Sequence, residues 1–504
     1  MPRGNGNGNG GAEKRLVIVS NRLPVSIAKE QGRWAVKPSS GGLVTALGPV
    51  LRNRGGIWIG WPGVSDKVET KELLARDTQS IGYTLAPVPL SDEEMDDYYY
   101  GFSNEVLWPL CHSLSTLCNY EPRYWAAYRE VNRKFATVIA DTVKPDDYLW
   151  VHDYHLMHVG RALRQLGVQT PVGFFLHIPF PSPDIYQRLP WRVQVLEGLL
   201  QYDLLGFQTE LHKRNFLNCV RAMIRDVEVE GRGQVVTLRI DGREVRVGNF
   251  PIGIDYESFA GAAESQEVTE TVTSLRNAMR SRCFILGVDR LDYTKGIPHK
   301  LEAMRNALQR YPELHGQVTF IQVVVPSRRE IPSYDNLKND IERKVGEING
   351  EFAEPGWVPI QYTYRSLKRV ELLAYYRAAQ IMLVTPLEDG MNLVAKEYAA
   401  CSVDGNNVLV LSEFAGAAAQ LRRGALLVNP YDTEGMADAI YRAYKMDPPE
   451  RQERIRRMKK VARENNIFTW VESFLQAGSA ADLKDFPVLA EPSAEDVAQW
   501  WDGG

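Results

Sequence analysis

The sequence predicts an α/β protein with two doubly wound domains that face each other across a cleft. Short β-rich apolar runs alternate with longer helical patterns along almost the whole chain, which is typical of repeated βαβ units. Several runs are apolar on both faces, as the strands of a parallel sheet covered by helices must be. The chain has 504 residues, too many for one ordinary hydrophobic core, so two large domains are expected.

The predicted strands fall into two series. The first series comprises RLVIVS (15–20), GIWIGW (56–61), YLWVHD (148–153), VGFFLHI (172–178) and LLGFQT (204–209). The second series comprises FILGVD (284–289), VTFIQVVV (318–325), IMLVTP (381–386), NVLVLSE (407–413) and ALLVNP (425–430). Helical patterns lie between the strands and include 155–167, 209–224, 298–311, 366–379 and 449–466.

The domain boundary is predicted between the two series. Residues 225–280 hold a Gly-rich hairpin-like piece and a charged helix, and NFPIGID (249–255) marks the crossing. We therefore expect a first domain over 15–250 and a second over 251–465. Residues 1–14 predict a disordered Gly/Asn-rich tail, and residues 466–504 a helix that packs back and a loose tail. That helix is expected over 470–477, with Gly478 as its stop.

The composition argues against nucleic acid and membrane partners. The formal net charge is −4, whereas a protein that binds a phosphate backbone usually carries a basic surplus. The N-terminal segment lacks the apolar core of a signal peptide, and no apolar run approaches the ~18 residues that span a bilayer. The five cysteines are scattered without metal-ligand spacing, so a reducing cytoplasm is the expected location.

Polar and charged side chains follow one predicted strand after another. Ligands of open parallel sheets bind at the carboxyl ends of the strands, so we expect these side chains to form one site. The residues at these positions are Asn21, Arg22, Asp153, Tyr154, His155, His177, Arg290, Asp292, Lys295, Arg328, Arg329 and Asp389.

The chemistry of this set points to phosphate and sugar. Four of its cations, Arg22, Arg290, Lys295 and Arg328, suit phosphate oxygens, and their number suggests more than one phosphate group. A helix is expected to start after Asp389, where backbone N–H groups can bind a diphosphate. The expected backbone donors are those of Asn392, Leu393 and Val394. Glu397, about two turns into this helix, is placed to accept hydrogen bonds from hydroxyls such as those of a ribose.

Six motifs resemble those of one enzyme family. FSNEVLWP, HDYHL, FFLHIPFP, YDLLGFQTE, RLDYTKG and PLEDGMNLVAKEY together resemble the trehalose-6-phosphate synthases, retaining glycosyltransferases of family 20, from about residue 15 to 475. The resemblance implies two Rossmann-like domains in the arrangement called GT-B. It also implies transfer of glucose from a nucleotide sugar to the C1 hydroxyl of glucose 6-phosphate, with retention, as the first step of trehalose biosynthesis.

The resemblance also implies roles for individual residues. The acceptor, glucose 6-phosphate, would be held by Arg22, Tyr99, Trp108, Asp153 and Arg328. The donor would be held by Gly42, His177, Arg290, Lys295, Asp389, Asn392, Leu393, Val394 and Glu397. The residues closest to the chemistry would be Asp153, His177, Arg290, Lys295 and Asp389.

The implied mechanism uses no metal and no cofactor. Arg290, Lys295 and the helix N-terminus would stabilise the charge on the leaving diphosphate, and the sequence lacks an Asp-x-Asp pair of the kind that metal-dependent glycosyltransferases use. The family's favoured mechanism is front-face transfer, in which Asp153 orients the acceptor. Covalent double displacement through a carboxylate stays open at this stage.

Each candidate has a simpler interpretation. Asp389 alone could be a helix N-cap, and His177 could be a histidine of the hydrophobic core. DEEMDDYYY (92–100) could be a solvated acidic turn with packed aromatics, and we accept surface roles for Asp96, Asp97 and Arg329. Trp61 fits the acceptor pocket and core packing equally well. The spacing of His152, His155 and His158 could suggest a metal, but no matching carboxylate cluster accompanies it.

The alternative functions are a non-catalytic regulatory protein that binds sugar phosphate and a pseudo-glycosyltransferase that joins cyclitols through nitrogen. The nucleotide of the donor stays open between UDP-, ADP- and GDP-glucose, because the stretch expected near the base, 362–366, departs from the familiar pattern. The resemblance further implies a homo-oligomer, with a tetramer as one form, and a separate trehalose-phosphate phosphatase acting downstream.

Overall fold

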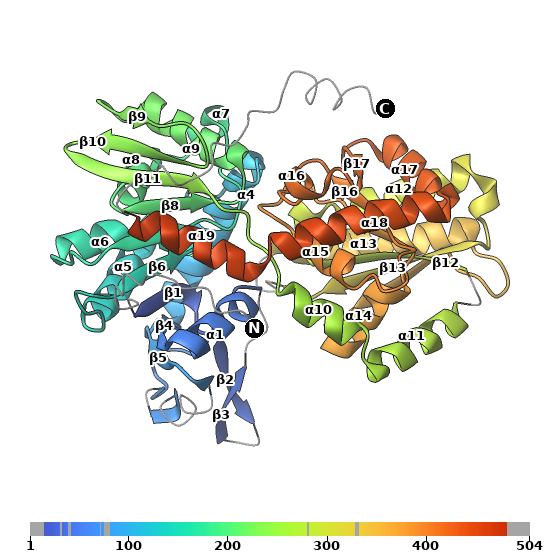
Figure 1. The fold of residues 1–504 in the computed structure, drawn as a ribbon, viewed down its shortest axis with the longest axis horizontal. Coiled ribbons are helices and arrows are strands. Elements are labelled where there is room, and N and C mark those ends of the chain that lie inside the picture. The colour runs from blue at the N-terminus through green and yellow to red at the C-terminus, as the bar shows by residue number, and fades with distance from the viewer. Residues whose placement is uncertain are drawn as a thin grey trace, which may run out of the picture.

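The structure is a computed structural model that describes residues 15–30, 33–38, 42–70, 72–74, 81–279, 282–327 and 332–480. Two large sheets, each flanked by helices, lie on opposite sides of the molecule (Figure 1). Over the described ranges, no helix combines the length and the apolar character needed to cross a membrane.

The first sheet has nine strands in the order β5-β4-β1-β6-β7-β8-β11-β10-β9. Neighbouring strands are parallel from β5 to β11, and β10 is antiparallel to both β11 and β9. The strands are β1 (Leu16–Arg22), β4 (Gly56–Trp61), β5 (Thr84–Pro87), β6 (Tyr148–His152), β7 (Val172–Phe175), β8 (Leu204–Phe207), β9 (Glu228–Glu230), β10 (Val235–Ile240) and β11 (Arg243–Asn249). A separate antiparallel hairpin pairs β2 (Val25–Glu30) with β3 (Arg33–Pro38).

The second sheet has six strands, all parallel, in the order β14-β13-β12-β15-β16-β17. They are β12 (Cys283–Arg290), β13 (Val318–Val325), β14 (Ile360–Tyr364), β15 (Ile381–Val384), β16 (Val408–Ser412) and β17 (Leu426–Val428). The chain runs outward from β12 to β14 on one side, returns to β15 on the other side of β12 and then runs outward to β17, which is the doubly wound pattern that the sequence predicts.

Helices connect the strands and cover the sheets. Around the first sheet they are α1 (Gly42–Arg54), α4 (Trp108–Cys111), α5 (Pro122–Ala140), α6 (Val159–Gln165), α7 (Pro183–Tyr186), α8 (Arg192–Leu199), α9 (Glu210–Met223) and, from the far end of the chain, α19 (Ile467–Ser479). Around the second they are α10 (Tyr256–Ala263), α11 (Gln266–Ala278), α12 (Ile297–Arg310), α13 (Pro332–Phe352), α14 (Arg369–Ala378), α15 (Leu393–Ala400), α16 (Ala418–Leu421), α17 (Thr433–Lys445) and α18 (Pro448–Glu464).

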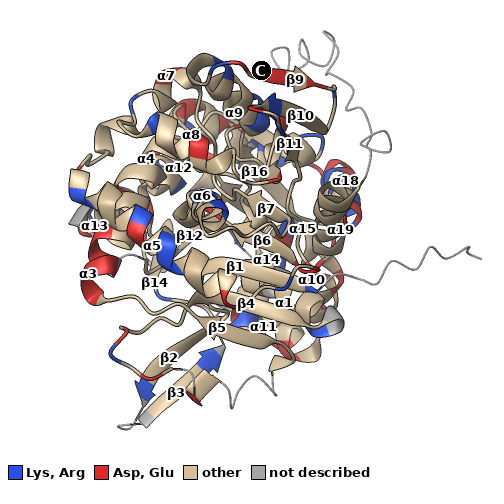
Figure 2. Cartoon of the chain, turned by 90° about the vertical axis from the view of Figure 1, so that its left-hand side faces the viewer, with Lys and Arg blue, Asp and Glu red and all other residues tan. Residues whose placement is uncertain are grey.

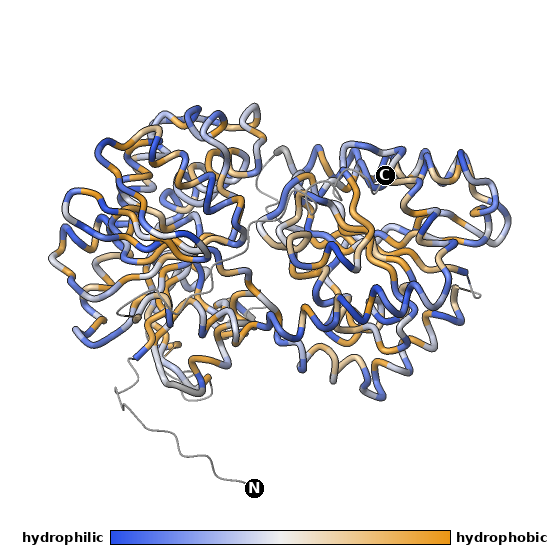
Figure 3. The backbone as a smooth tube through the Cα atoms, turned by 45° about the horizontal axis from the view of Figure 1, so that its top comes forward, coloured by the Kyte–Doolittle hydropathy of each residue, from blue (hydrophilic) through white to orange (hydrophobic). Residues whose placement is uncertain are grey.

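The central strands form the core because both of their faces are apolar. Every residue of β6, β7, β8, β15 and β16 is buried. Figure 3 shows the same pattern as hydrophobic colour along the middle of each half, with hydrophilic colour on the outer helices. All ten predicted strands are present; those predicted over 56–61 and 318–325 have the predicted ends, and the other eight have shifted ends. The sequence analysis missed β2, β3, β5, β9 and β14, which lie at sheet edges or in the small hairpin and so lack a long buried run.

The segment 92–107 is helical, so the interpretation of DEEMDDYYY as a solvated turn is wrong in its local structure. It forms α3 (Asp92–Glu94), visible as an acidic surface helix in Figure 2, and then a wide-turn π-helix, η1 (Met95–Leu107). Ser91 and Glu94 form a reciprocal capping box at its start, a sequence signal that the prediction did not use. The accepted surface role fits Asp96, which is exposed.

The last described helix packs on the first sheet. Figure 1 shows α19 lying against the first sheet. The Phe474 ring of α19 stacks on Trp150 of β6, with centroids 4.3 Å apart. The prediction that Gly478 stops this helix is wrong, because α19 continues to Ser479. A Cβ at position 478 would overlap the Tyr148 hydroxyl, so glycine is needed there for close packing rather than for a turn.

Candidate active site

An ion pair joins two strand ends of the second sheet. Lys295 lies in the short turn η4 (Tyr293–Lys295) after β12, and Asp389 follows β15. The Lys295 Nζ lies 2.6 Å from Asp389 Oδ2, with both side chains largely buried. Burial alone would raise the pKa of the Asp389 carboxyl, but the Lys295 ammonium outweighs that effect and the pKa lies below its ordinary value. Asp389 is therefore ionised at neutral pH.

The start of α15 lies beside this pair. Asn392, with a left-handed φ of 68°, precedes the helix, and its Nδ2 donates to Asp389 Oδ2 at 3.1 Å. The first turn carries no acidic side chain. The N–H groups of Leu393 and Val394 belong to the first turn, where a helix has no internal acceptors for them. The arrangement can therefore bind an anion through backbone donors and the Lys295 ammonium together.

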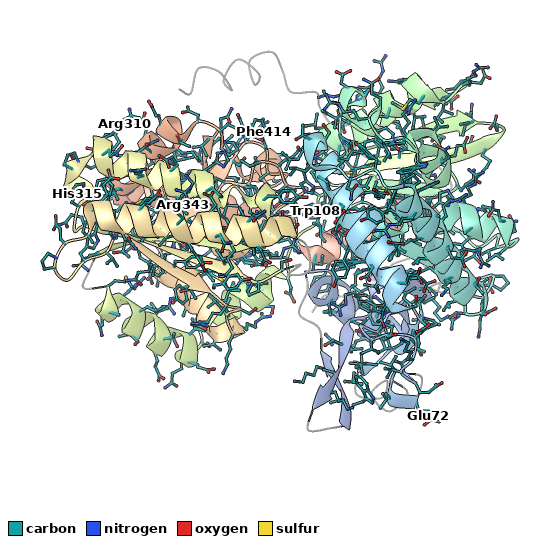
Figure 4. All side chains as sticks on the ribbon, turned by 180° about the vertical axis from the view of Figure 1, so that it is seen from behind. Glu72, Trp108, Arg310, His315, Arg343 and Phe414 are labelled. Carbon is teal, nitrogen blue, oxygen red and sulfur yellow. The ribbon has the colours of Figure 1, made fainter. Side chains whose placement is uncertain are left out.

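Arg290 of the second domain lies next to Trp108 of the first domain. Arg290 ends β12, and its guanidinium carbon lies 5.9 Å from the centre of the Trp108 ring, which comes from α4. The Trp108 Nε1 also lies 3.4 Å from Asp292 Oδ1. Figure 4 shows Trp108 where the ribbons of the two halves meet. A cation of the second half thus faces an aromatic ring of the first.

Asp153 and His177 follow neighbouring strands of the first sheet. Asp153 has a φ of 76°, which is uncommon for a residue with a side chain, and its Oδ1 accepts from the His177 backbone N–H at 3.3 Å. His177 as a whole is half-buried, and its ring lies beside the rings of Phe175 and Trp470, with centroids 4.8 and 6.1 Å away. Burial lowers the pKa of His177 to about 3, so the ring is neutral. Its Nε2 lies 3.2 Å from Nδ1 of His152.

A second cationic position lies at the end of β1. The exposed Arg22 guanidinium carbon is 4.9 Å from the Trp61 ring, and a Cβ on Gly63 would lie 2.6 Å from Arg22 Nη2. Trp61 is partly buried: it packs against the hydrophobic core of the first domain as well as facing Arg22, and its Nε1 donates to the Val64 carbonyl. Arg22 ends β1 in the first domain, whereas Arg290 ends β12 and Lys295 follows that strand in the second domain.

Four further residues were predicted to bind a substrate: Tyr99, Glu397, Gly42 and Arg328. Tyr99 of η1 stacks on His155, with centroids 5.6 Å apart. Glu397 of α15 accepts a hydrogen bond from the Tyr376 hydroxyl at 2.9 Å, and burial raises its pKa. Gly42 begins α1. Arg328 lies outside the described residues.

The comparisons with known proteins agree with this arrangement. A family model described as glycosyltransferase family 20 matches residues 14–479. The chain belongs to this family. The predicted fold class, two Rossmann-like domains in the GT-B arrangement, is confirmed by family 20 structures that superpose with a TM-score of 0.83.

Two relatives illustrate the similarity within family 20. A trehalose-6-phosphate synthase from Mycobacterium sp. (strain KMS) is 43% identical over 476 residues, which cover 93% of this chain and 96% of the relative. An α,α-trehalose-phosphate synthase [UDP-forming] A from Dictyostelium discoideum is 42% identical over 472 residues, 92% of this chain. The match spans 62% of the length of the Dictyostelium relative.

Two solved structures of family 20 carry ligands. One, from Burkholderia xenovorans, is a UDP-forming α,α-trehalose-phosphate synthase in complex with glucose 6-phosphate; it is 37% identical and covers 92% of this chain and 100% of that chain. The other, from E. coli, is described as bound with UDP-2-fluoro glucose; it is 36% identical and covers 93% and 100%.

Several residues beside the site were missed by the sequence analysis. Glu388 precedes Asp389, and burial raises its pKa to about 7 while a hydrogen bond from Ser113 of the first half opposes that rise. His112 lies under Trp108, with its Nδ1 2.8 Å from the Trp108 carbonyl oxygen. Gln208 follows β8 and would have been found by the rule that polar residues at strand ends form the site. Among the described residues, no three or more His, Cys, Asp and Glu side chains group as a possible metal site.

Proposed function

We propose that this chain is a trehalose-6-phosphate synthase, which transfers glucose with retention from a nucleotide-glucose donor to glucose 6-phosphate. The observation that carries the proposal is the Lys295–Asp389 pair at the start of α15, with Arg290 facing Trp108 of the other half. This combination offers a cationic anchor for a diphosphate, an ionised carboxylate for sugar hydroxyls and an aromatic ring that faces Arg290. The names and ligands of the family 20 relatives support the same assignment.

The proposed mechanism assigns the donor to the second domain. Lys295, Arg290 and the N–H groups of Leu393 and Val394 stabilise the negative charge that develops on the leaving diphosphate. Asp389 accepts hydrogen bonds from the donor glucose, because Lys295 keeps its carboxylate ionised. These groups supply the electrostatic stabilisation that a metal supplies elsewhere, so the proposed reaction requires no added metal or cofactor.

The first domain holds the acceptor in this mechanism. Arg22 binds the phosphate of glucose 6-phosphate, with Arg328 as a second expected contact, and Tyr99 and Trp108 lie against the sugar. Asp153 orients the C1 hydroxyl. Its carboxylate already accepts the His177 N–H, which favours an orienting role over attack on the donor. We therefore propose front-face transfer, in which the acceptor proton passes to the leaving phosphate oxygen.

The donor panel tests the assignment directly. Purified protein, glucose 6-phosphate and either UDP-, ADP- or GDP-glucose are incubated with EDTA, and mass spectrometry measures the disaccharide monophosphate. We expect product with UDP-glucose, the donor named for the UDP-forming relatives, and the panel ranks ADP- and GDP-glucose against it. Absence of product with every donor, from protein that still binds glucose 6-phosphate, would favour a regulatory protein or a pseudo-glycosyltransferase.

Two further parts of the proposal concern the setting of the reaction. We propose a homo-oligomer, which sedimentation of the purified protein tests, and a separate phosphatase that removes the product's phosphate. A relative from Thermoproteus tenax, named as a bifunctional synthase/phosphatase, is 42% identical, and the match spans 63% of its length. Persistence of the disaccharide monophosphate over a long incubation would support a separate phosphatase, and its conversion to free disaccharide would contradict it.

A further inference from the structure

Two segments of the chain cross between the sheets, and they are packed together. The first, residues 250–255, follows β11, and the second joins α18 to α19 (Figure 1). A Cβ on Gly253 would overlap the Asn465 carbonyl oxygen, and the Ile467 N–H donates to the Ile254 carbonyl at 3.0 Å. The first crossing is therefore held in a defined position between the two domains.

The backbone N–H and the backbone carbonyl of one residue in this crossing, Ile252, are bound by buried side chains from opposite domains. The Ile252 N–H donates to Gln208 Oε1 at 3.0 Å, and Gln208 directly follows β8 of the first sheet. The Ile252 carbonyl accepts from Lys396 Nζ at 2.6 Å, and Lys396 lies in α15 of the second domain. Gln208 is 1% exposed and Lys396 0%, so water does not compete for either bond. We name this arrangement, Gln208–Ile252–Lys396, the Ile252 bridge.

The bridge fixes the orientation of the Gln208 amide. A peptide N–H can only donate, so the atom facing Ile252 must be the Gln208 oxygen. The Gln208 Nε2 is then turned toward His177 Nδ1, at 3.5 Å. An NH₂ group can only donate, so Nδ1 of His177 must accept and the ring proton must be on Nε2. That proton points to Nδ1 of His152, 3.2 Å away.

We propose that Gln208 is a positioning residue that sets the tautomer and orientation of His177 and ties this histidine, through Ile252 and Lys396, to the helix whose N-terminus binds the donor. The inference rests on the proposed function, since it assumes that His177 contacts the donor glucose. Lys396 is adjacent to Glu397 and one turn from the start of α15. A shift of this helix relative to the first domain therefore acts, through the Ile252 carbonyl, on the same residue whose N–H orients Gln208.

The first test measures the proton on His177 by nuclear magnetic resonance of protein labelled with ¹⁵N-histidine, with His177→Gln used to assign the signals. Wild-type protein is expected to carry the proton on Nε2 only. In Gln208→Glu at pH 9, where the new carboxylate is ionised, no donor faces Nδ1, so Nδ1 is expected to gain a proton. The exposed substitution Gln187→Glu is the matched control and is expected to leave the His177 signals unchanged.

Either of two results would overturn the proposal: a wild-type His177 protonated on Nδ1, or a His177 in Gln208→Glu that keeps an unprotonated Nδ1 at pH 9. This readout needs no substrate and no turnover. It therefore separates failure of this inference from failure of the proposed function, which the donor panel tests.

The second test asks whether the bridge acts as a unit during turnover. Gln208→Met and Lys396→Met each remove one bond to Ile252 while keeping the side-chain volume. Each is expected to lower kcat about 10-fold or more, the loss that follows from a misplaced reactive group, with a smaller change in the KM of glucose 6-phosphate. The double variant is expected to lose much less than the product of the single losses, because both substitutions break the same unit. Fully multiplicative losses in folded variants would contradict the bridge.

Discussion

Gly390 lies directly against the backbone of His177, so that a Cβ at position 390 would overlap the His177 carbonyl oxygen. The contact joins the loop after β15 in the second domain to the loop after β7 in the first. Gly416 packs in turn on Gly390, where a Cβ would overlap the Gly390 carbonyl. Gly390 therefore allows the strand-end loops that carry Asp389 and His177 to meet, and Gly416 allows the loop after β16 to pack behind Gly390.

Replacing Gly390 by alanine is expected to separate these loops. The methyl group has no room, so the domains must move apart, and displacement of the reactive groups by about 1 Å is expected to lower kcat/KM about 100-fold. Initial rates with UDP-glucose and glucose 6-phosphate measure the effect. The control is Gly346→Ala in α13, where an added Cβ meets nothing within 4 Å. This control is expected to keep full activity, and an equally active Gly390→Ala protein would show that the contact is not needed for turnover.

The Lys295–Asp389 pair predicts that a double substitution restores stability without restoring activity. Lys295→Met leaves a largely buried carboxylate without its partner, so it is expected to destabilise the protein by about 3–5 kcal/mol. In the double variant Lys295→Met/Asp389→Asn no unpaired charge remains, so most of that stability should return while activity stays on the order of 100-fold or more below wild type. Urea unfolding and initial rates measure the two effects. A double variant as unstable as Lys295→Met would mean that the pair is not the source of the loss.

Much of the fold was predictable because buried parallel strands are long apolar runs. The same reason explains the misses: β5 and β14 lie at sheet edges, and β9 and the β2–β3 hairpin lack such runs. The segment 92–107 was not predicted as a π-helix because hydrophobic periodicity distinguishes helix from strand but not the hydrogen-bond pattern within a helix. Gly478 was predicted to end the last helix because its packing partner, Tyr148, is 330 residues away in the sequence and cannot be identified from the local pattern.

The site was predictable where one rule applied. Lys295 and Asp389 follow neighbouring parallel strands, whose carboxyl ends meet at one edge, and the structure places them in contact. Trp108 and Tyr99 follow no strand, so only the family resemblance pointed to them. The Gly390–His177 contact and the Ile252 bridge depend on how the two domains meet, which no local pattern in the sequence determines.

The Tyr376–Glu397 hydrogen bond predicts a donor-specific effect. Tyr376→Phe removes the only hydroxyl shown donating to Glu397 among the described residues, so the carboxylate loses its fixed orientation toward a ribose. A hydrogen bond to a charged group contributes about 1.5–3 kcal/mol, so the KM of UDP-glucose is expected to rise about 10-fold or more, with the KM of glucose 6-phosphate unchanged. The control is Tyr398→Phe, which removes a buried hydroxyl bonded to the Ala379 carbonyl. Equal changes for both substrates would argue against a ribose contact.

Lys396 predicts a dependence of stability on pH. Burial lowers its pKa from 10.5 to about 7 in the folded protein. Between these two values the unfolded chain binds more protons than the folded protein, so folding becomes more favourable as the pH rises. From pH 7 to pH 9 this single group is expected to add about 2 kcal/mol to the free energy of unfolding.

The measurement is the difference between wild type and Lys396→Met in urea unfolding at pH 7, 8 and 9. The difference isolates this lysine, because buried thiols such as Cys401, whose pKa burial raises, act on both proteins alike and in the opposite direction as the pH rises. Lys396→Met lacks the titrating group, so wild type should gain about 2 kcal/mol on the variant over this range. The exposed substitution Lys460→Met should track wild type at every pH. If the difference in the free energy of unfolding between wild type and Lys396→Met stayed constant from pH 7 to pH 9, the prediction would be wrong. Lys396 would then be charged over this whole range, and a buried ammonium would make the bond to the Ile252 carbonyl.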